Sequence, residues 1–298
     1  MPRFKLTIEY AGTRYSGWQI QKNARTVQGE IDRAVRAVTG RGDFELYGSG
    51  RTDAGVHALA QVAHLDVSTS LTAEALVPRL NDELPSDINV LRAAVVPHRF
   101  HARHDAVARR YVYQIARRRT AFAKPFVWWV REPLDLTRMR EAAAAFVGMK
   151  DFQSFAAMDD DERAGGAPSV ARRAGGTEGA RTPDRKSTLV LVERLDVVEA
   201  GDLVLVGIEG SHFLWKMVRR VVGVLVEIGR GGLAPSAAAG FLLESSGAPA
   251  RLTAPASGLF LERVWHQGDA RDVPLRAATP LYDVGSRRTP STSRTTSR

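Results

Sequence analysis

The 298-residue sequence contains no cysteine, and this absence excludes several kinds of chemistry. Without thiols the chain cannot form disulfides, use a thiolate nucleophile or build a zinc–thiolate site. No apolar run approaches the roughly 20 residues needed to cross a bilayer. The first residues enter a strand-like pattern without the apolar core of a secretory signal. We therefore expect a cytoplasmic protein with no membrane partner.

The motifs of the common nucleotide-dependent and serine-dependent enzymes are also missing. No GxGxxG follows a strand pattern, no Walker A lysine is present, and no Gly-x-Ser-x-Gly elbow offers a serine nucleophile. His57 and His64 have no third ligand at a metal-site spacing. We expect neither a cofactor nor a metal ion, although a metal-dependent phosphoesterase that uses Asp53, His57 and His64 remains an alternative.

Positive charge, in contrast, is abundant. The formal net charge is +9, of which residues 284–298 supply +4 because they hold four arginines and no acid. Between His98 and Arg119 a single acid, Asp105, stands against seven arginines. The seven are Arg99, Arg103, Arg109, Arg110, Arg117, Arg118 and Arg119. Arginine binds phosphate in a planar, bidentate manner, so this cluster predicts a polyanionic partner, with a merely solvated basic strand as the alternative.

Hydrophobic periodicity predicts an α+β fold. Alternating residues predict strands at 4–10, 44–47, 63–67, 88–96, 107–117, 189–198, 203–209 and 258–265. Helical spacing predicts a helix capped by Thr26 and others at 73–80, 136–147, 211–228 and 235–243. Because strands and helices mix without a strict β-α-β rhythm, we expect a largely antiparallel sheet.

Two segments lack any periodic apolar pattern. Residues 158–187 combine six acids with six bases and many small residues, and residues 267–298 are rich in arginine, serine and threonine. Neither segment can bury enough apolar area to offset the entropy of ordering it. We predict a disordered insertion at 158–187 and a disordered tail at 267–298.

The most informative segment is Arg51-Thr52-Asp53-Ala54-Gly55-Val56-His57-Ala58, which lies between two predicted strands. The simplest interpretation is a loop in which Asp53 caps a turn and Arg51 is solvated. The functional interpretation is a single carboxylate among basic groups, where a nearby Arg51 would hold Asp53 ionised, as a nucleophile or base requires.

Six segments, in order, resemble the tRNA pseudouridine synthase A family. They are Tyr10-x-Gly12-x-x-Tyr15-x-Gly17-Trp18-Gln19-x-Gln21, Gly50-Arg51-Thr52-Asp53-Ala54-Gly55-Val56-His57-Ala58, Phe100-His101-Ala102-Arg103, Arg109-Arg110-Tyr111, Asp151-Phe152-x-Ser154-Phe155 and Phe213-Leu214-x-x-Met217-Val218-Arg219. The resemblance covers residues 4–265. It departs from the family pattern after Phe155, where this chain is longer, and at residues 187–190, where an arginine of the family pattern is missing.

The resemblance implies two similar α+β halves, each a mostly antiparallel sheet with helices on one face, joined into one long mixed sheet around a central basic cleft. Residues 1–105 would form the half with the Asp53 loop, and residues 106–266 the other. It further implies a homodimer that converts uridines at positions 38, 39 and 40 of the tRNA anticodon stem-loop to pseudouridine, without cofactor or metal. A non-catalytic tRNA-binding protein or chaperone on the same fold is the alternative.

Residue by residue, the resemblance makes Asp53 the catalytic aspartate and Tyr111 the tyrosine that stacks on the target base. Arg51 and Arg219 correspond to active-site arginines. The remaining substrate-contacting residues are expected to be Arg103, Arg109, Arg110 and His57, with His57 as a structural member of its motif. Whether Asp53 attacks C1′ of the ribose or C6 of the base stays open, as does a role of Tyr111 in removing a ribose proton.

Overall fold

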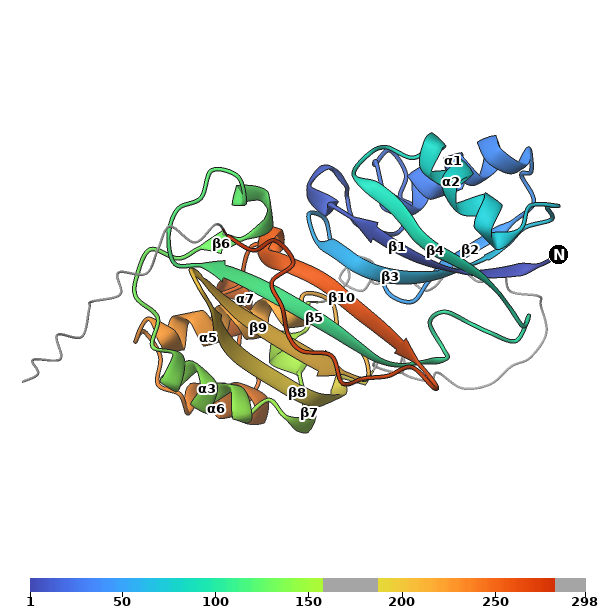
Figure 1. Cartoon of the computed structure of the whole chain (residues 1–298). Helices are drawn as coiled ribbons and strands as arrows, with labels where there is room; N and C mark the ends of the chain where they lie inside the picture. The colour runs from blue at the N-terminus through green and yellow to red at the C-terminus, as the bar shows by residue number, and fades with distance from the viewer. Residues whose placement is uncertain (158–186, 282–298) are drawn as a thin grey trace, which may run out of the picture.

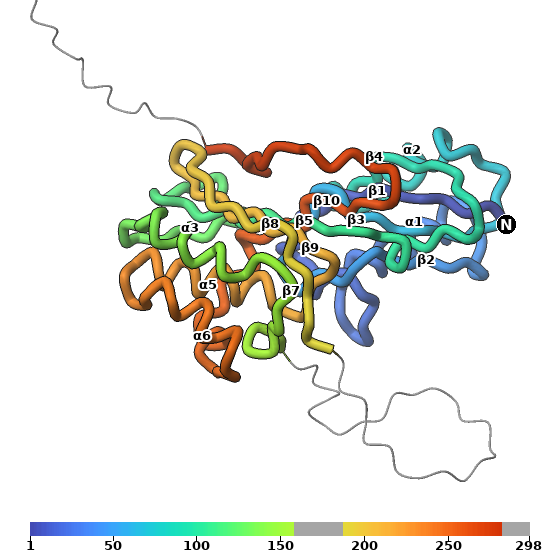
Figure 2. The backbone as a smooth tube through the Cα atoms, turned by 90° about the horizontal axis from the view of Figure 1, so that it is seen from below, coloured from blue at the N-terminus to red at the C-terminus, as the bar shows by residue number. Residues whose placement is uncertain are grey.

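The computed structural model describes residues 1–157 and 187–281, in which ten strands form one sheet (Figures 1 and 2). The strand order is β4-β1-β3-β10-β5-β9-β8-β7, with β2 paired to β3 and β6 paired to β5. The strands are β1 (Arg3–Tyr10), β2 (Glu45–Gly48), β3 (His57–Asp66), β4 (Ile88–Val96), β5 (Ala106–Ala116), β6 (Trp128–Trp129), β7 (Gly148–Asp151), β8 (Leu189–Ala200), β9 (Leu203–Gly210) and β10 (Leu259–His266). Most neighbours are antiparallel, as the sequence predicts.

The last strand makes the sheet both continuous and mixed. β10 lies between β3 and β5, although it follows them by more than 140 residues in the sequence. It is antiparallel to β5 but parallel to β3, which it pairs through Phe260 opposite His57 and Leu261 opposite Ala58. The predicted α+β fold with one long mixed sheet is therefore confirmed.

Six α-helices lie in the described residues. They are α1 (Val27–Thr39), α2 (Ala73–Glu83), α3 (Leu136–Ala144), α5 (Met217–Gly229), α6 (Ala237–Leu243) and α7 (Ala248–Arg251). Helices α1 and α2 cover one end of the sheet, and α3, α5 and α6 cover the other (Figure 1). Thr26 caps α1 as predicted, because its hydroxyl accepts a hydrogen bond from the Gly29 N–H at 3.2 Å.

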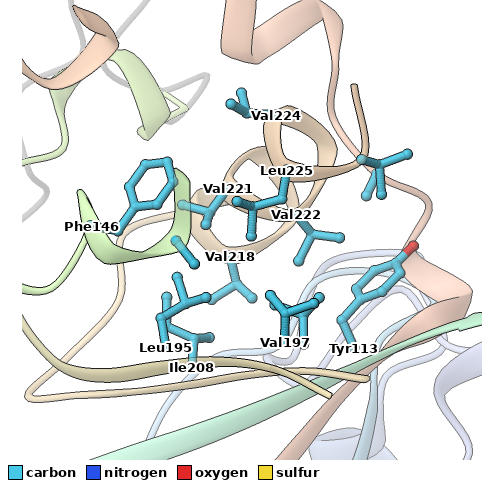
Figure 3. Packing of buried hydrophobic residues seen from close by; sticks show 14 of the residues in the cluster. Tyr113, Phe146, Leu195, Val197, Ile208, Val218, Val221, Val222, Val224 and Leu225 are labelled. Carbon is cyan, nitrogen blue, oxygen red and sulfur yellow. The ribbon is translucent and has the colours of Figure 1, made fainter. Parts of the chain in front are cut away.

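Two hydrophobic clusters hold these layers together. One joins β1, β3 and β4 to α1 and α2, through residues such as Ile8, Leu65 and Ile31. The other joins β5, β8 and β9 to α3 and α5, and Figure 3 shows Val218, Val221 and Leu225 of α5 facing Leu195 and Ile208 of the strands. Burial of these aliphatic side chains contributes about 1.5–3 kcal/mol each to the free energy of unfolding.

The opposite face of the sheet is covered by chain from beyond β10. Residues 267–281, which we call the C-terminal strap, run along the face away from α3, α5 and α6 (Figure 2). Leu275 packs so closely on β9 that a Cβ at Gly207 would lie 2.8 Å from it. Residues 267–281, which the sequence places in a disordered tail, are therefore packed on the sheet. The predictions for 158–186 and 282–298 lie outside the described residues.

Most predicted elements agree with the structure within a few residues, and the largest differences are at the starts of β3, which begins at His57 and not at residue 63, and of α5. The sequence predicts a helix from residue 211, but α5 begins at Met217. Lys216 has φ 59°, in the left-handed region, so residues 211–216 cannot continue the helix in the N-terminal direction. No helix in the described residues is long and apolar enough to cross a bilayer.

Candidate active site

The Asp53 loop (residues 49–56) connects β2 to β3. It is held in place by the aromatic loop (residues 11–21), which follows β1. The N–H of Trp18 donates to the Thr52 carbonyl at 3.1 Å, and the N–H of Gly55 donates to the Tyr15 carbonyl at 3.3 Å. The hydroxyls of Tyr10 and Thr52 are hydrogen-bonded at 2.7 Å. These three contacts fix the backbone on both sides of Asp53.

Two glycines let the two loops meet backbone to backbone. Gly17 has φ +92°, and a Cβ there would lie 2.5 Å from the Thr52 carbonyl oxygen. A Cβ at Gly12 would lie 1.9 Å from the Val56 carbonyl oxygen. Any side chain at either position would push the Asp53 loop away. Tyr15 and Trp18 are buried in the same contact, so this aromatic loop supports the Asp53 loop.

Asp53 lies in a cleft of about 1060 Å³ between the Asp53 loop, the first half of β5 and the segment before α5. Its carboxylate faces the guanidinium of Arg219, with Oδ2 and Nη1 3.4 Å apart. Arg219 is itself fixed, because its Nε–H donates to the Ala254 carbonyl at 2.7 Å. The sequence led us to expect Arg51 as the partner of Asp53. That expectation is wrong: Arg51 is exposed at the wall of the cleft, and the ion pair comes from α5.

Burial and charge act in opposite directions on Asp53. Removal from water is the larger effect and raises the pKa of its carboxyl above the usual value. The Arg219 guanidinium, the Lys216 ammonium and a hydrogen bond from Trp215 lower that pKa and so favour the ionised form. Partial removal from water makes an ionised carboxylate a stronger nucleophile, and the neighbouring cations favour the ionised form that the attack requires.

Tyr111 of β5 lines the same cleft. Its ring lies edge-to-face with that of Phe213, with centroids 5.2 Å apart and planes at 86°. Burial raises the pKa of the Tyr111 phenol, and the negative charge of Asp53 raises it further. The hydroxyl therefore stays protonated at neutral pH, and the ring is an apolar surface close to the carboxylate.

Arg109 and Arg103 close one end of the cleft. The Arg109 guanidinium donates to four backbone carbonyls, including Ser211 at 2.6 Å and Ser49 at 3.2 Å. It thereby joins the end of β9 to the Asp53 loop. Arg103 is exposed and also lines the cleft, so its charge is available to a ligand.

Two predicted substrate-contacting residues do not line this cleft. Arg110 faces the C-terminal strap, where its guanidinium forms a buried, bidentate ion pair with Glu262 and donates to the Val273 carbonyl at 2.7 Å. His57 is buried beneath its loop, and its Nδ1 accepts from the Gly12 N–H at 2.9 Å. Its Nε2–H then donates to the Pro125 and Ser257 carbonyls. The structure thus brings Asp53, Arg51, Tyr111, Arg219, Arg103 and Arg109 together and leaves these two outside.

The arginine cluster between His98 and Arg119 does not form one phosphate-binding surface. Only Arg103 and Arg109 line the cleft. Arg117 and Arg118 instead pair with Glu199 and Asp202, at the turn between β8 and β9. The sequence shows the density of positive charge but not its internal acidic partners, which lie more than 80 residues away.

The sequence analysis assigned no role in the site to several residues of the cleft. Phe213, Trp215 and Lys216 line it between β9 and α5, and Ser16, Gln19 and Gln21 line it from the aromatic loop. Trp215 and Lys216 occupy the two unspecified positions of the Phe-Leu-x-x-Met-Val-Arg segment, so the motif indicated their location but not their part in the site. Among the described residues no three His, Asp or Glu side chains could hold a metal ion together, so Asp53, His57 and His64 do not form the site that a metal-dependent phosphoesterase needs.

Comparison with known proteins agrees with this geometry. A family model described as tRNA pseudouridine synthase matches residues 6–105 and 176–266. A protein of Nitrobacter winogradskyi named tRNA pseudouridine synthase A is 38% identical over 279 residues, which cover 93% of this chain and 99% of that protein. A protein of the same name from Syntrophotalea carbinolica is 41% identical over 262 residues, covering 87% of this chain and 94% of that protein.

A solved structure, a chain from a Cbf5-Nop10-Gar1 complex, matches with a TM-score of 0.28 at 10% identity over 75% of this chain and 45% of that one, which is too distant to support an argument. The family model covers the Asp53 loop and α5, and the Nitrobacter winogradskyi relative covers 93% of the chain. The chain therefore belongs to the tRNA pseudouridine synthase A family, whose activity is the isomerisation of uridines in tRNA.

Proposed function

We propose that this protein converts uridine to pseudouridine at positions 38, 39 and 40 of the tRNA anticodon stem-loop, with Asp53 as the nucleophile. The observation that carries the proposal is the placement of Asp53. It is a largely desolvated carboxylate in a cleft of about 1060 Å³, ion-paired to Arg219 and close to the ring of Tyr111. The positions 38, 39 and 40 rest on the family resemblance.

The target uridine must leave its base stack before its glycosidic bond can reach Asp53. Extruding a nucleotide costs a few kcal/mol, least where the base is already poorly paired. Stacking of the uracil on Tyr111 offsets roughly 1–3 kcal/mol of that cost. Arg51 and Arg103 lie exposed on the wall of the cleft, where they can bind the phosphates that flank the flipped nucleotide.

The reaction needs one carboxylate and no external reagent. Asp53 forms a bond to the substrate, either at C1′ of the ribose or at C6 of the uracil, and the C1′–N1 bond breaks. The uracil then rotates, its C5 bonds to C1′, the bond to Asp53 is released, and the C5 proton is lost while N1 gains one. Atoms and electrons balance, so the product is an isomer of the substrate. Arg219 keeps the Asp53 carboxylate ionised and oriented before the attack and receives it again as an ion pair when the bond to the substrate breaks.

The larger architecture implied by the family is also a proposal. Residues 1–105 and 106–266 would be the two similar halves, with the cleft as the central basic groove between them, and two chains would form a homodimer in the cytoplasm. The two hydrophobic clusters support the division into halves. Light scattering coupled to size-exclusion chromatography tests the dimer, which a mass of about 33 kDa for the free protein would contradict.

The proposal is tested by mapping pseudouridine in tRNA before and after incubation with the purified protein. We expect new pseudouridine at one or more of positions 38, 39 and 40 and none elsewhere. Modification confined to another arm of the tRNA would contradict the proposed substrate position. Tight tRNA binding with no modification of any tRNA would favour the alternative, a tRNA-binding protein or chaperone on this fold.

A further inference from the structure

An exposed aromatic side chain lies next to the cleft but outside it. Tyr47 of β2 has 51% of its surface exposed, and its ring is stacked on that of His64, with centroids 5.4 Å apart and planes at 19°. His64 is buried, and its Nδ1 accepts from the Ala102 N–H at 3.1 Å, which fixes the imidazole. The Tyr47 ring is therefore supported by a fixed imidazole while about half of the residue remains exposed to solvent.

Two imidazoles extend this surface. The His101 ring lies 5.9 Å from that of Tyr47, and the His104 ring lies 4.2 Å from that of His101. We call Tyr47, His101 and His104 the aromatic patch. His104 is exposed and His101 is partly exposed, so the patch offers neighbouring ring surfaces of different tilt.

The patch is continuous with the cleft that holds Asp53. The Arg103 N–H donates to His101 Nδ1 at 3.2 Å, while the Arg103 side chain lines the cleft. Ser49, which also lines the cleft, follows Tyr47 by two residues, or about 7 Å along the chain. That separation is close to the length of one nucleotide in an extended strand.

The chemistry of the patch suits an unpaired nucleobase better than a phosphate. Asp105 and Glu45 lie close by, and the charge of Arg3 is balanced by Asp66. Arg103 is an exposed cation that lines the cleft next to the patch. An exposed aromatic ring such as that of Tyr47 binds bases by stacking, which every base allows. Phe122, exposed elsewhere in the described structure, has no comparable ring beneath it among the aromatic contacts of the described residues.

We propose that the aromatic patch is a second nucleotide-binding site, in which Tyr47 stacks on an unpaired base of the same tRNA whose target uridine occupies the cleft. The proposal rests on tRNA being the substrate, and it names a contact outside the catalytic centre. The site would favour a stem-loop in which a nucleotide near the target uridine is unpaired and can leave the stack of loop bases.

The test compares Tyr47→Ala with Tyr47→Phe for affinity to an anticodon stem-loop RNA. Loss of one base stack corresponds to roughly 5- to 150-fold in Kd, and we expect about tenfold for Tyr47→Ala. Tyr47→Phe keeps the ring and should bind within twofold of the unmodified protein. Phe122→Ala removes an exposed aromatic away from the cleft and is the matched control, with no expected change. Thermal melting of each variant checks that it is folded.

Two further measurements identify the kind of contact. A stem-loop carrying 2-aminopurine at one loop position at a time should show quenched fluorescence at one position on binding, and Tyr47→Ala should abolish that quenching. The slope of log Kd against log salt should not change in Tyr47→Ala, because no charge is lost. It should fall by about one ion in Arg103→Gln if Arg103 contacts phosphate.

An unchanged Kd in Tyr47→Ala, or equal weakening by Tyr47→Ala and Tyr47→Phe, would overturn the proposal. So would a change in oligomeric state of Tyr47→Ala, since the patch would then be a protein interface. These outcomes are independent of the proposed function, because the unmodified protein can form pseudouridine at positions 38–40 whether or not Tyr47 contributes to binding.

Discussion

Successive residues of β5 point to opposite faces of the sheet and have different roles on each face. Arg109 and Tyr111 line the cleft, whereas Arg110 and Val112 face the C-terminal strap. On the cleft side, the Arg109 guanidinium joins neighbouring loops through backbone carbonyls, and the Tyr111 ring lines the space that a ligand would enter. On the strap side, the Arg110–Glu262 pair is buried and all its partners belong to the protein. The Arg-Arg-Tyr segment therefore combines a structural arginine with residues of the active site.

The largest expected effect is on stability, from a substitution of Arg110 on the strap side of β5. Removing it leaves the Glu262 carboxylate buried without its partner, so we expect Arg110→Ala to lower the free energy of unfolding by about 3–5 kcal/mol. Urea unfolding measures the effect. The fraction that remains folded should keep nearly the full tRNA affinity of the unmodified protein.

Replacing both partners by apolar residues, as in Arg110→Met with Glu262→Leu, should restore much of the lost stability. Loss of tRNA binding in a folded, stable double variant would show that Arg110 contacts the substrate after all.

A substitution in the cleft should instead lower activity. Arg219→Ala removes the cation that lowers the pKa of Asp53, so the pKa of that carboxyl should rise further above its usual value. Because Asp53 must be ionised to act, the acid limb of the profile of kcat/KM against pH should move to higher pH. At neutral pH we expect kcat/KM to fall on the order of 10²-fold.

Arg51→Ala is the matched control, because Arg51 lines the same cleft without an ion pair to Asp53 in the described structure. It should weaken binding but leave the acid limb in place. An acid limb that moved equally in both variants would contradict the assignment of Arg219 as the partner of Asp53.

The affinity for tRNA should depend on the ring of Tyr111 but not on its hydroxyl. Tyr111→Ala removes a stacking surface, and we expect Kd for tRNA to rise by roughly 5- to 150-fold. Tyr111→Phe keeps the ring and should retain the affinity. Filter binding measures both variants, and equal weakening would argue against stacking. A fall in turnover with unchanged affinity in Tyr111→Phe would point to a role for the hydroxyl in proton removal.

The smallest expected effect is on the free energy of unfolding at acid pH, and it comes from two histidines of β3 and not from β5. Burial lowers the pKa of His64 from 6.5 to about 4, and that of His57 is lowered as well. Both imidazoles are neutral in the fold, and the unfolded chain takes up protons first as pH falls. The contribution of His64 is therefore present above its unfolded pKa of 6.5 and is lost progressively as pH falls toward about 4, and the contribution of His57 is lost in the same direction.

Urea unfolding at pH 7 and pH 5 should show a lower free energy of unfolding at pH 5. His64→Asn removes the titrating group but retains an oxygen that can accept from the Ala102 N–H, and it should flatten this dependence. A dependence as steep as that of the unmodified protein would mean that His64 is not responsible.

The sequence predicted those features that depend on local chemistry. Periodicity located nearly all the strands, and Thr26 marked the start of α1 because a capping side chain is a local signal. The motifs placed Asp53, Tyr111 and Arg219, which the fold brings to one cleft from β5, α5 and the loop between β2 and β3.

Long-range pairing escaped the sequence because nothing local encodes it. Arg51 is two residues from Asp53, yet the ion pair comes from Arg219, which is 166 residues away. The insertion of β10 between β3 and β5 and the burial of Arg110 against Glu262 depend likewise on which distant strands meet. Residues 267–281 have too few apolar side chains for a periodic pattern, but Leu275 and Leu281 suffice to pack on the sheet.

The most direct test of the central claim is the release of tritium from tRNA labelled at C5 of uridine, measured for Asp53→Asn and the unmodified protein. The substitution keeps the size of the side chain and removes the carboxylate that the cleft holds next to Arg219. We predict that Asp53→Asn binds tRNA with an affinity close to that of the unmodified protein and releases no tritium above background. Release by Asp53→Asn at the rate of the unmodified protein would contradict the assignment of Asp53 as the nucleophile.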